Sequence, residues 1–281
     1  MSFLDHIARC NSHDLTNFVP LIVDGAIAGR VRRDHLAHLE RFSEVFTLGQ
    51  DNVHLAGDLC GYRDRTEAVD IVVRTLFEQG LLPYLQNEPY PVGGNWGGPH
   101  AFEIERAAVA FFGIPAYGVH INGFVCAGRG LKLWIGVRAD DRSVCPGELD
   151  NMIAGGQPVT LSLKENVVKE AREEAGVLPQ LANTAIPTST ITYVMENEIG
   201  LRQDTMFCWD LALPPDFKPV NSDGEISEFR LLPVETVMQI VDTGFEFKFN
   251  CNLVIIDFLI RHGFLSSEHP DYEMILQGLR R

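Results

Sequence analysis

A two-part α+β fold is predicted for this 281-residue chain from three observations. Short apolar strands and amphipathic helices follow one another along the whole chain, the stretch NEPYPVGGNWGGPH breaks this pattern at residues 87–100, and no run approaches eighteen consecutive apolar residues. We therefore expect a small α+β unit over residues 1–112 and a larger unit over residues 113–281, in which strands are packed between helices.

The first unit contains a hairpin and a helix. The segments FVPLIVDG and AIAGRVR read as two strands that turn at Asp24 and Gly25. The segment DRTEAVDIVVRTLFEQG reads as an amphipathic helix, with Thr66 as its cap and Gly80 at its end. A short helix, ERAAVAFFG, leads into the second unit.

The second unit begins with two strands, VHINGFVCAG and KLWIGVRA, which are expected to be antiparallel and joined at residues 128–130. The loop DDRSVCPGELDNMIAGG and a helix come next. Three further strands, TAIPTSTITYVM, DTMFCWDLAL and EISEFRLLP, precede two helices, PVETVMQIVDTG and CNLVIIDFLIRHG.

The helix after the loop has clear end signals. Ser162 and Glu165 form an S-x-x-E capping box, and Gly176 occupies the position of a C-terminal glycine, so the helix is expected over residues 163–175. Its acids, Glu170, Glu173 and Glu174, fall on one edge, since the second and third lie about 60° and 40° to either side of the first at about 100° per residue.

This acidic edge lies beside the apolar stripe, whereas Lys169 and Arg172 are expected to point toward solvent. Three carboxylates so close repel one another, and a bound Mg²⁺ or Mn²⁺ is the simplest compensation. A solvated acidic face on a capped helix is the alternative, and the glutamates alone leave both open.

Composition excludes other classes of function. With 38 acidic and 23 basic residues the formal net charge is −15, which argues against a sequence-independent grip on nucleic acid. The six cysteines are dispersed and read as reduced, mostly buried thiols. The opening MSFLDHIARC lacks the layout of a signal peptide, so we expect a cytoplasmic protein that is not inserted in a membrane.

The segment from Gly155 to Val177 resembles the Nudix box, G-x5-E-x7-R-E-U-x-E-E-x-G-U, where U is aliphatic. EAREEAGV, residues 170–177, matches its second half, and counting back places Gly155 on the first glycine. Two positions depart from the pattern: Leu161 stands for the first glutamate, and Lys169 stands for the arginine. If the pair Gly155-Gly156 is instead aligned with the double glycine usual in the family, Ser162 stands for that glutamate. Lysine keeps the charge but not the bidentate fork.

Further segments, GVHINGF, LWI and PGELDN leading into AGG, are similar to the Nudix subfamily related to the domain fused to fungal thiamine pyrophosphokinase, and the likeness covers the whole chain. This resemblance implies an α/β/α sandwich with a mixed sheet. It also implies Mg²⁺-dependent hydrolysis of a small diphosphate, with (oxidised) thiamine diphosphate giving the monophosphate and phosphate.

The resemblance also assigns site residues. Glu170, Glu173, Glu174 and the carbonyl of Gly155 would hold the metal, and either Glu225 or Glu170 would be the general base. Substrate contacts are expected from four further residues, each with a purely structural alternative: Arg142, His120, Asn122 and Trp96.

Other functions stay open at this point. An isomerase of the isopentenyl diphosphate type would need a cysteine and a glutamate facing each other across the cleft, with Cys126 and Cys145 as candidates. A non-catalytic diphosphate-binding module is motivated by Leu161 and Lys169, and an oxidised nucleoside diphosphate is an alternative substrate. Residues 1–112 either cap the cleft or build a homodimer.

Overall fold

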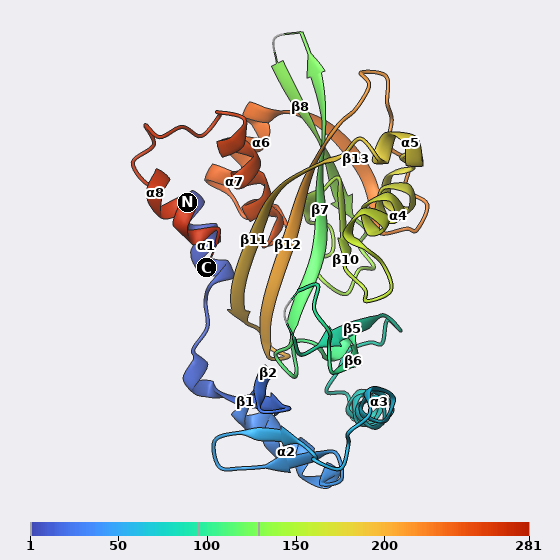
Figure 1. The fold of residues 1–281 in the computed structure, drawn as a ribbon. Helices are drawn as coiled ribbons and strands as arrows, with labels where there is room; N and C mark the ends of the chain where they lie inside the picture. Colours follow the sequence, from blue (N-terminus) through green and yellow to red (C-terminus); the bar gives the residue numbers. More distant parts are fainter. Residues whose placement is uncertain (1, 95, 129, 281) are drawn as a thin grey trace.

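A mixed sheet between two helical layers forms the larger part of the molecule (Figure 1). The computed structural model describes residues 2–94, 96–128 and 130–280. Seven strands make up the sheet: β7 (Pro115–Ala127), β8 (Gly130–Arg138), β9 (Leu149–Asn151), β10 (Ile153–Gly156), β11 (Ile186–Glu196), β12 (Leu201–Ala212) and β13 (Ile226–Pro233).

The strand order is β11-β12-β7-β8-β13, with β10 paired to β7 and β9 to β8. The β7–β12 pairing is parallel and the others in this sheet are antiparallel, so the sheet is mixed. The expected strands are confirmed. The loop before the glutamate helix also contains β9 and β10, which sequence reasoning missed because strands of three or four residues show little alternation.

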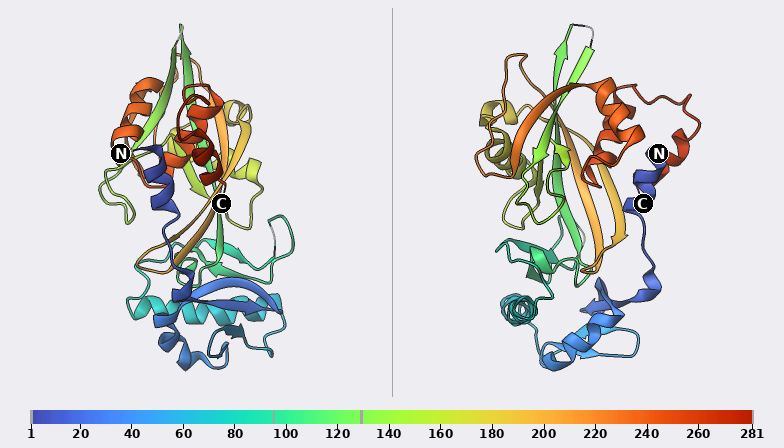
Figure 2. Two further views of the ribbon diagram at one scale, coloured as in Figure 1. Left: turned by 90° about the vertical axis from the view of Figure 1, so that its left-hand side faces the viewer. Right: turned by 180° about the vertical axis from the view of Figure 1, so that it is seen from behind.

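Helices cover both faces of this sheet (Figures 1 and 2). On one side lie α4 (Leu163–Ala175) and α5 (Pro179–Ala182); on the other lie α6 (Val234–Thr243), α7 (Cys251–Arg261), α8 (Tyr272–Gly278) and α1 (Phe3–Cys10). The predicted α/β/α sandwich is therefore confirmed.

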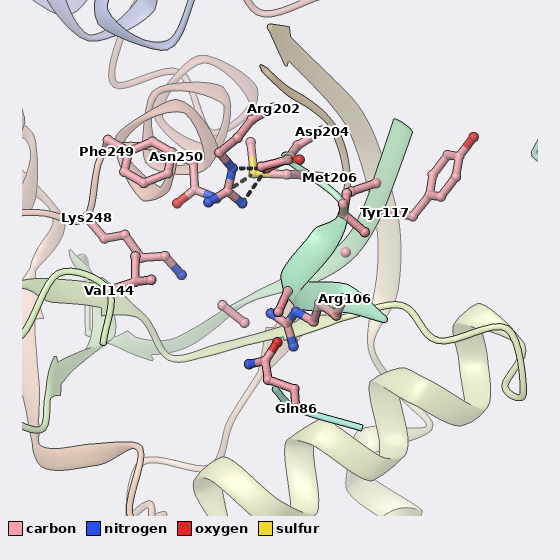
Figure 3. Close-up of a pocket in the computed structure, with 18 of the residues that line it drawn as sticks. Gln86, Arg106, Tyr117, Val144, Arg202, Asp204, Met206, Lys248, Phe249 and Asn250 are labelled. Carbon is pink, nitrogen blue, oxygen red and sulfur yellow. Dashed lines mark hydrogen bonds and ion pairs between the residues drawn. The ribbon is translucent and has the colours of Figure 1, made fainter. Parts of the chain in front are cut away.

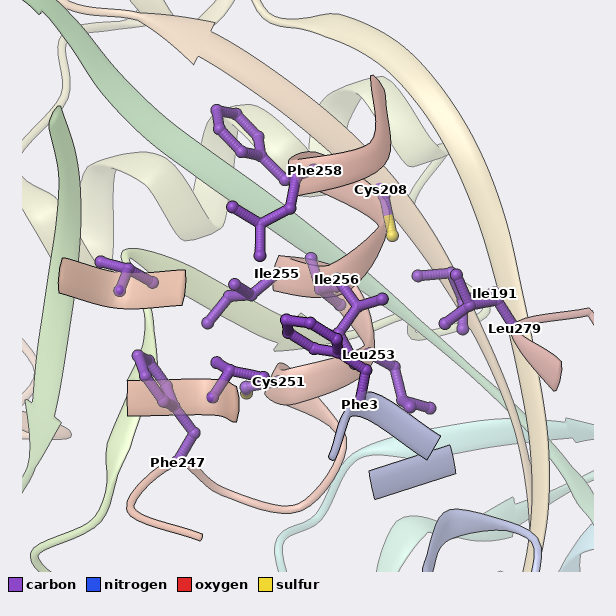
Figure 4. Packing of buried hydrophobic residues seen from close by; sticks show 14 of the residues in the cluster. Phe3, Ile191, Cys208, Phe247, Cys251, Leu253, Ile255, Ile256, Phe258 and Leu279 are labelled. Carbon is purple, nitrogen blue, oxygen red and sulfur yellow. The ribbon is translucent and has the colours of Figure 1, made fainter. Parts of the chain in front are cut away.

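Helix α1 belongs to the C-terminal core, although it opens the chain. Phe3 and Ile7 are buried in the same apolar cluster as the residues of α7, and Figure 4 shows Phe3 beside that helix. A Cβ on Gly278 of α8 would collide with the Ile7 side chain, so α1 and α8 are in close contact. The domain boundary at residue 112 stays a prediction. The packing of α1 shows that residues 3–10 lie against the second unit.

The first unit is a four-stranded sheet with one long helix. Its elements are β1 (Phe18–Val23), β2 (Ala26–Arg32), α2 (Leu36–Leu39), β3 (Phe46–Leu48), β4 (Val53–Leu55), α3 (Tyr62–Glu78) and the two-stranded β5 (Pro89–Val92) and β6 (Phe102–Glu105). The hairpin turns at Asp24 and Gly25, both at positive φ, as the Asp-Gly pair predicts.

Two local predictions in this unit were wrong. Helix α3 begins at Tyr62 with Gly61 as its N-cap, and the hydroxyl of Thr66 instead donates to the carbonyl of Tyr62 inside the helix. The expected helix before β7 is a single 3₁₀ turn at Arg106–Ala108, because a hydrogen bond from Ile114 to Val109 closes the following segment into turns.

None of the described helices is long and apolar enough to cross a membrane. Cys10, Cys208 and Cys251 are buried free thiols, Cys145 is half-buried, and Cys60 and Cys126 are exposed.

Candidate active site

Helix α4 carries the carboxylates of the site, and its bounds agree with those predicted. The side chain of Ser162 accepts a hydrogen bond from the Glu165 N–H, the Glu165 carboxylate accepts in return from Ser162, and Gly176 has a φ of 64°. These caps fix which residues of α4 face the sheet. Val167, Ala171 and Ala175 are buried beneath the helix.

The three glutamates do not share one environment. Glu174 is 4% exposed and accepts a hydrogen bond from the backbone N–H of Ala154 at 2.9 Å, while Glu170 is 8% exposed. A Cβ on Gly155 would collide with the Glu170 carboxyl group, whose Oε1 would lie 2.6 Å away. The glycine at this position of β10 therefore gives Glu170 room to lie against the strand.

Burial raises the pKa of both inner carboxyl groups. The pKa of Glu174 is raised well above its usual range by burial and by the neighbouring Glu170. The pKa of Glu170 is raised by burial and lowered in part by Lys169. Two buried acids that oppose each other's ionisation are a costly arrangement, which a cation between them would relieve.

Glu173 lies at the exposed rim of this group, with a side chain that is 47% exposed. Lys169 is exposed, as expected, with a side chain that is 43% exposed. It also contacts two carboxylates, with its Nζ 3.0 Å from Glu170 Oε1 and 3.0 Å from Glu173 Oε2. Lys169 thus keeps a positive charge beside Glu170 at the position where the Nudix box has an arginine.

The donor set fits a hard divalent cation in part. Among the described residues no three His, Cys, Asp or Glu side chains are already gathered into a metal-binding group. Glu170 and Glu174 supply two carboxylates against the backbone of Ala154 and Gly155, and Glu173, which contacts Lys169, is a third carboxylate on the same helix. Oxygen donors of this kind suit Mg²⁺ or Mn²⁺.

A pocket of about 280 Å³ opens beside this strand, with Ala154, Gly155 and Gly156 in its wall (Figure 3). Although the chain is strongly acidic, the described lining contains these cationic side chains: Arg106, Arg138, Arg142, Arg202 and Lys248. Asp204 and Glu225 also line the pocket and pair with Arg202 and Arg142, so the lining keeps an excess of cations. Such an excess in an acidic protein indicates a site for an anionic small molecule.

Arg142 and Glu225 are brought together at the pocket wall. A guanidinium nitrogen of Arg142 lies 2.8 Å from Glu225 Oε1, and both residues line the pocket. The backbone N–H of Glu225 donates to Asp223, which fixes the loop before β13. The pair thus places one cation and one carboxylate on the side of the pocket formed by the loops after β8 and before β13.

The remaining predicted substrate residues lie in three different places. His120 lines the pocket, but its Nδ1 is paired with Asn151 Oδ1 at 2.9 Å. Asn122 is buried away from the pocket lining and donates to Asp210 at 3.2 Å. Trp96 packs on Tyr117 with ring centroids 4.6 Å apart, and it borders a second pocket together with Leu161.

His120 should make the protein sensitive to mild acid. Burial, and Lys248 nearby, lower its pKa from 6.5 to about 4, so the unfolded chain binds the proton more readily and stability falls as the pH drops below about 6.5. Between pH 7 and pH 5 this costs about 2 kcal/mol. His120→Gln should lose correspondingly less over this interval.

The measurement is urea unfolding of both proteins at pH 7 and pH 5. His6 and His35, whose pKa values are also lowered by burial, stay in both proteins, so the difference reports His120. Equal losses in the two proteins would contradict the prediction.

Apart from Arg142, sequence reasoning missed the basic residues that line the pocket. Lys248, between α6 and α7, is 3.5 Å from Asp150 Oδ2, which Arg138 contacts at 2.8 Å, so two cations share one carboxylate. Arg106 comes from the first unit. Arg138 ends β8, and only the folded chain brings Lys248 and Arg106 to the same pocket.

The fold is that of an α+β protein with a mixed sheet between two helical layers. The carboxylates of one helix lie against β10, beside a cationic pocket, and this arrangement suits the binding of a phosphate compound. The chain is 40% identical over 290 residues to Nudix hydrolase 20, chloroplastic, of Arabidopsis thaliana, which covers 99% of this chain and 77% of that protein. It is 39% identical over 282 residues to Nudix hydrolase 24, chloroplastic, of the same plant, with the same coverage. The chain therefore belongs to the Nudix hydrolase family.

Two further comparisons complete the picture. Residues 2–116 match a family model described as a domain of unknown function, DUF4743. Among solved structures, a MutT/nudix family protein from Enterococcus faecalis is similar with a TM-score of 0.43 and 13% identity, over 58% of this chain and 67% of that one. The expected class of activity, hydrolysis by a Nudix enzyme, is confirmed by the two plant relatives.

Proposed function

We propose that this protein is a Mg²⁺- or Mn²⁺-dependent diphosphatase that cleaves the diphosphate of a small metabolite, with (oxidised) thiamine diphosphate as its substrate and the monophosphate and phosphate as products. The observation that carries the proposal is that Ala154 and Gly155, against which the buried Glu174 and Glu170 lie, form part of the wall of a pocket that also contains five cationic side chains. A diphosphate needs both, because its charge must be neutralised and the attacked phosphorus positioned.

Glu170 and Glu174, joined by Glu173 and the carbonyl of Gly155, would hold the metal. A bound divalent cation would supply charge neutralisation and a water of lowered pKa. The chain's own part is to bind and orient the diphosphate. Arg142 and Lys248 approach from the pocket walls, and the backbone of Ala154 fixes Glu174 through one hydrogen bond.

Glu170 and Glu225 are the two candidates for the general base, and Glu170 can act as the base only if it is not a metal ligand, because a carboxylate bound to a cation does not accept a proton. Burial raises the pKa of Glu170, which favours proton uptake by this carboxylate when it is free. The Glu225 carboxylate is paired with Arg142 and is a suitable positioning group for that arginine. With Glu170 free of the metal, we assign the base to Glu170 and the positioning of Arg142 to Glu225; with Glu170 on the metal, Glu225 is the remaining candidate for the base.

The substrate assignment rests on the subfamily resemblance and on the pocket. Its volume of about 280 Å³ lies near the lower end for small-molecule sites, which favours a compact metabolite over a dinucleotide. Beyond the cations, the lining offers the aromatic ring of Phe249 and the polar groups of Asp204 and Asn250, whereas the ring of Tyr117 packs on Trp96 and points away from them (Figure 3). A flat, cationic heteroaromatic ring would be held by such groups.

The alternatives are less well supported. No cysteine is part of the described pocket lining, which disfavours an isomerase that needs one facing a glutamate. The binding-module alternative depends on Leu161, which borders the second pocket beside Trp96 and does not line the cationic one. An oxidised nucleoside diphosphate stays in the substrate panel. A cytoplasmic location also stays a proposal, and both plant relatives carry chloroplastic in their names.

The test is phosphate release from thiamine diphosphate, its oxidised analogues and oxidised nucleoside diphosphates, with Mg²⁺ and with EDTA. We expect turnover that EDTA abolishes, and the highest kcat/KM on an oxidised thiamine diphosphate. Absence of turnover on every compound, combined with a rise in melting temperature on ligand addition, would support the non-catalytic module instead.

A further inference from the structure

The first unit of the chain forms part of the wall of the cationic pocket. Its contributions, all from the segment matched as a domain of unknown function, are Tyr84, Gln86, Tyr90, Arg106, Val109 and Ala110. Figure 3 shows Gln86 and Arg106 beside each other on the pocket wall. Of the two roles left open for this unit, capping the cleft is the one that these contacts support.

This unit also packs directly on the segment that leads from β10 into α4. The N–H of Val159 donates to the carbonyl of Pro89 at 3.4 Å, and the Tyr90 hydroxyl donates to the carbonyl of Tyr117 at 3.4 Å. A Cβ on Gly156 would collide with that hydroxyl. The strand that supports the metal-binding carboxylates is thus held from its other side by the first unit.

Arg106 is the charged group that this contact brings to the site. A Cβ on Gly156 would lie 3.0 Å from both Cζ and Nη1 of Arg106, so the guanidinium packs against the glycine that follows Gly155. Glu88 Oε2 accepts from Nη1 at 2.7 Å. The side chain of Arg106 is 39% exposed, and the residue lines the pocket.

The pairing of Arg106 leaves capacity for a ligand. A guanidinium has five N–H donors in a planar fork that matches phosphate oxygens in bidentate fashion. Only Nη1 is joined to a carboxylate in the described structure. By contrast, Arg138 is 7% exposed and donates to Asp150 and to the carbonyls of Val144 and Cys145, so its donors serve the fold.

We propose that Arg106 binds the diphosphate of the substrate through the donors that Glu88 does not take, and that the domain of unknown function thereby completes the active site. This inference rests on the proposed function, because it concerns the ligand of the same pocket. Arg106 comes from the first unit, whereas the other cations of the pocket come from the second. Without residues 84–110 the pocket would lack one wall and this phosphate-binding cation.

The test uses methylenediphosphonate, which is not hydrolysed, together with Mg²⁺, and measures its affinity for the full chain by calorimetry. Arg106→Gln should weaken binding about 10-fold or more, the loss expected for a charge-assisted hydrogen bond to phosphate. Glu88→Gln should bind the probe at least as tightly as wild type, because the carboxylate that competes for Arg106 is removed. Arg74→Gln is the matched control, since Arg74 lies on α3 and pairs with Asp70 away from the pocket.

The opposite responses of the two partners separate binding from a structural role. If the ion pair served only the fold, both variants would lower the melting temperature and neither would change the affinity of the folded protein, which would overturn the inference. Phosphate release is measured in parallel. Binding that depends on Arg106 without turnover on any diphosphate would sink the proposed function alone, whereas a wild type that does not bind the probe would sink both.

Discussion

Replacing Glu174 by glutamine is expected to reduce phosphate release about 1000-fold or more, since a metal-held charge contributes several kcal/mol to such a transition state. Glutamine keeps the volume of the side chain and a carbonyl oxygen that can accept from the Ala154 N–H. The fold is therefore expected to be retained, and the loss reports the missing negative charge. Phosphate release with saturating Mg²⁺ is the measurement.

The same variant should be more stable than wild type in the absence of metal. Because burial and Glu170 raise the pKa of Glu174, the folded state favours the protonated carboxyl, and this contribution to stability is lost as the pH rises above the unfolded value. Glutamine does not ionise, so its advantage should grow with pH. Adding Mg²⁺ should raise the melting temperature of wild type more than that of the variant.

Glu165→Gln is the control for both measurements, because it makes the same chemical change on the same helix in the capping box. It should retain turnover and lose only about 0.5–1 kcal/mol of stability. Full activity of the Glu174 variant would contradict the assignment. Lost activity with an unchanged response to Mg²⁺ would show that Glu174 acts in another way than by holding the metal.

Helix α4 could be predicted to its end residues because its signals are local. The capping residue Ser162 and the glycine at 176 directly flank the helix, and Glu165 lies in its first turn. A helical wheel placed all three acids on one edge, yet it could not say that β10 would cover Glu170 and Glu174 and leave Glu173 exposed. That distinction depends on a strand of four residues, Ile153–Gly156, that pairs with β7.

Of the cations that line the pocket, only Arg142 could be predicted from the sequence. Arg106 and Lys248 are separated by about half of the chain, and neither lies in a recognisable motif. His120 and Asn122 lie two residues apart on the same face of β7, and both are buried. Only His120 borders the pocket, whereas Asn122 contacts Asp210. Which polar residue of a buried strand faces a ligand is decided by the neighbouring strands and loops, not by its own spacing.

Asp150→Asn is expected to destabilise the protein by about 3–5 kcal/mol, the cost of breaking a buried ion pair on one side only. Asp150 is buried, and its Oδ2 lies 2.8 Å from Arg138 Nη1 and 3.5 Å from Lys248 Nζ. Its Oδ1 accepts from the Asn151 N–H at 2.8 Å and from the Cys251 thiol at 2.6 Å. An asparagine would point its NH₂ group at donors on one side or the other. It would also leave the buried Arg138 and the mostly buried Lys248 without a carboxylate.

Acid should reveal the same interaction. Burial by itself would raise the pKa of Asp150, but Lys248 and Arg138 hold it at about 2, below the ordinary 3.8. A carboxyl with a lowered folded-state pKa stabilises the protein above its unfolded value, and this contribution is lost as the pH falls toward 2. Wild type should therefore lose over that interval a contribution that the variant lacks.

Urea unfolding at neutral pH measures the main effect, and Asp34→Asn is the control. Asp34 also contacts an arginine, Arg32, at 2.6 Å, but its side chain is exposed, so its removal should cost at most about 1 kcal/mol. Equal stability of Asp150→Asn and wild type would show that Arg138 and Lys248 find other partners. If Asp150→Asn loses the predicted free energy of unfolding, Asp150 is the group that lets Arg138 and Lys248 lie together at the pocket wall. The affinity of the Asp150→Asn protein for methylenediphosphonate should then differ from that of wild type.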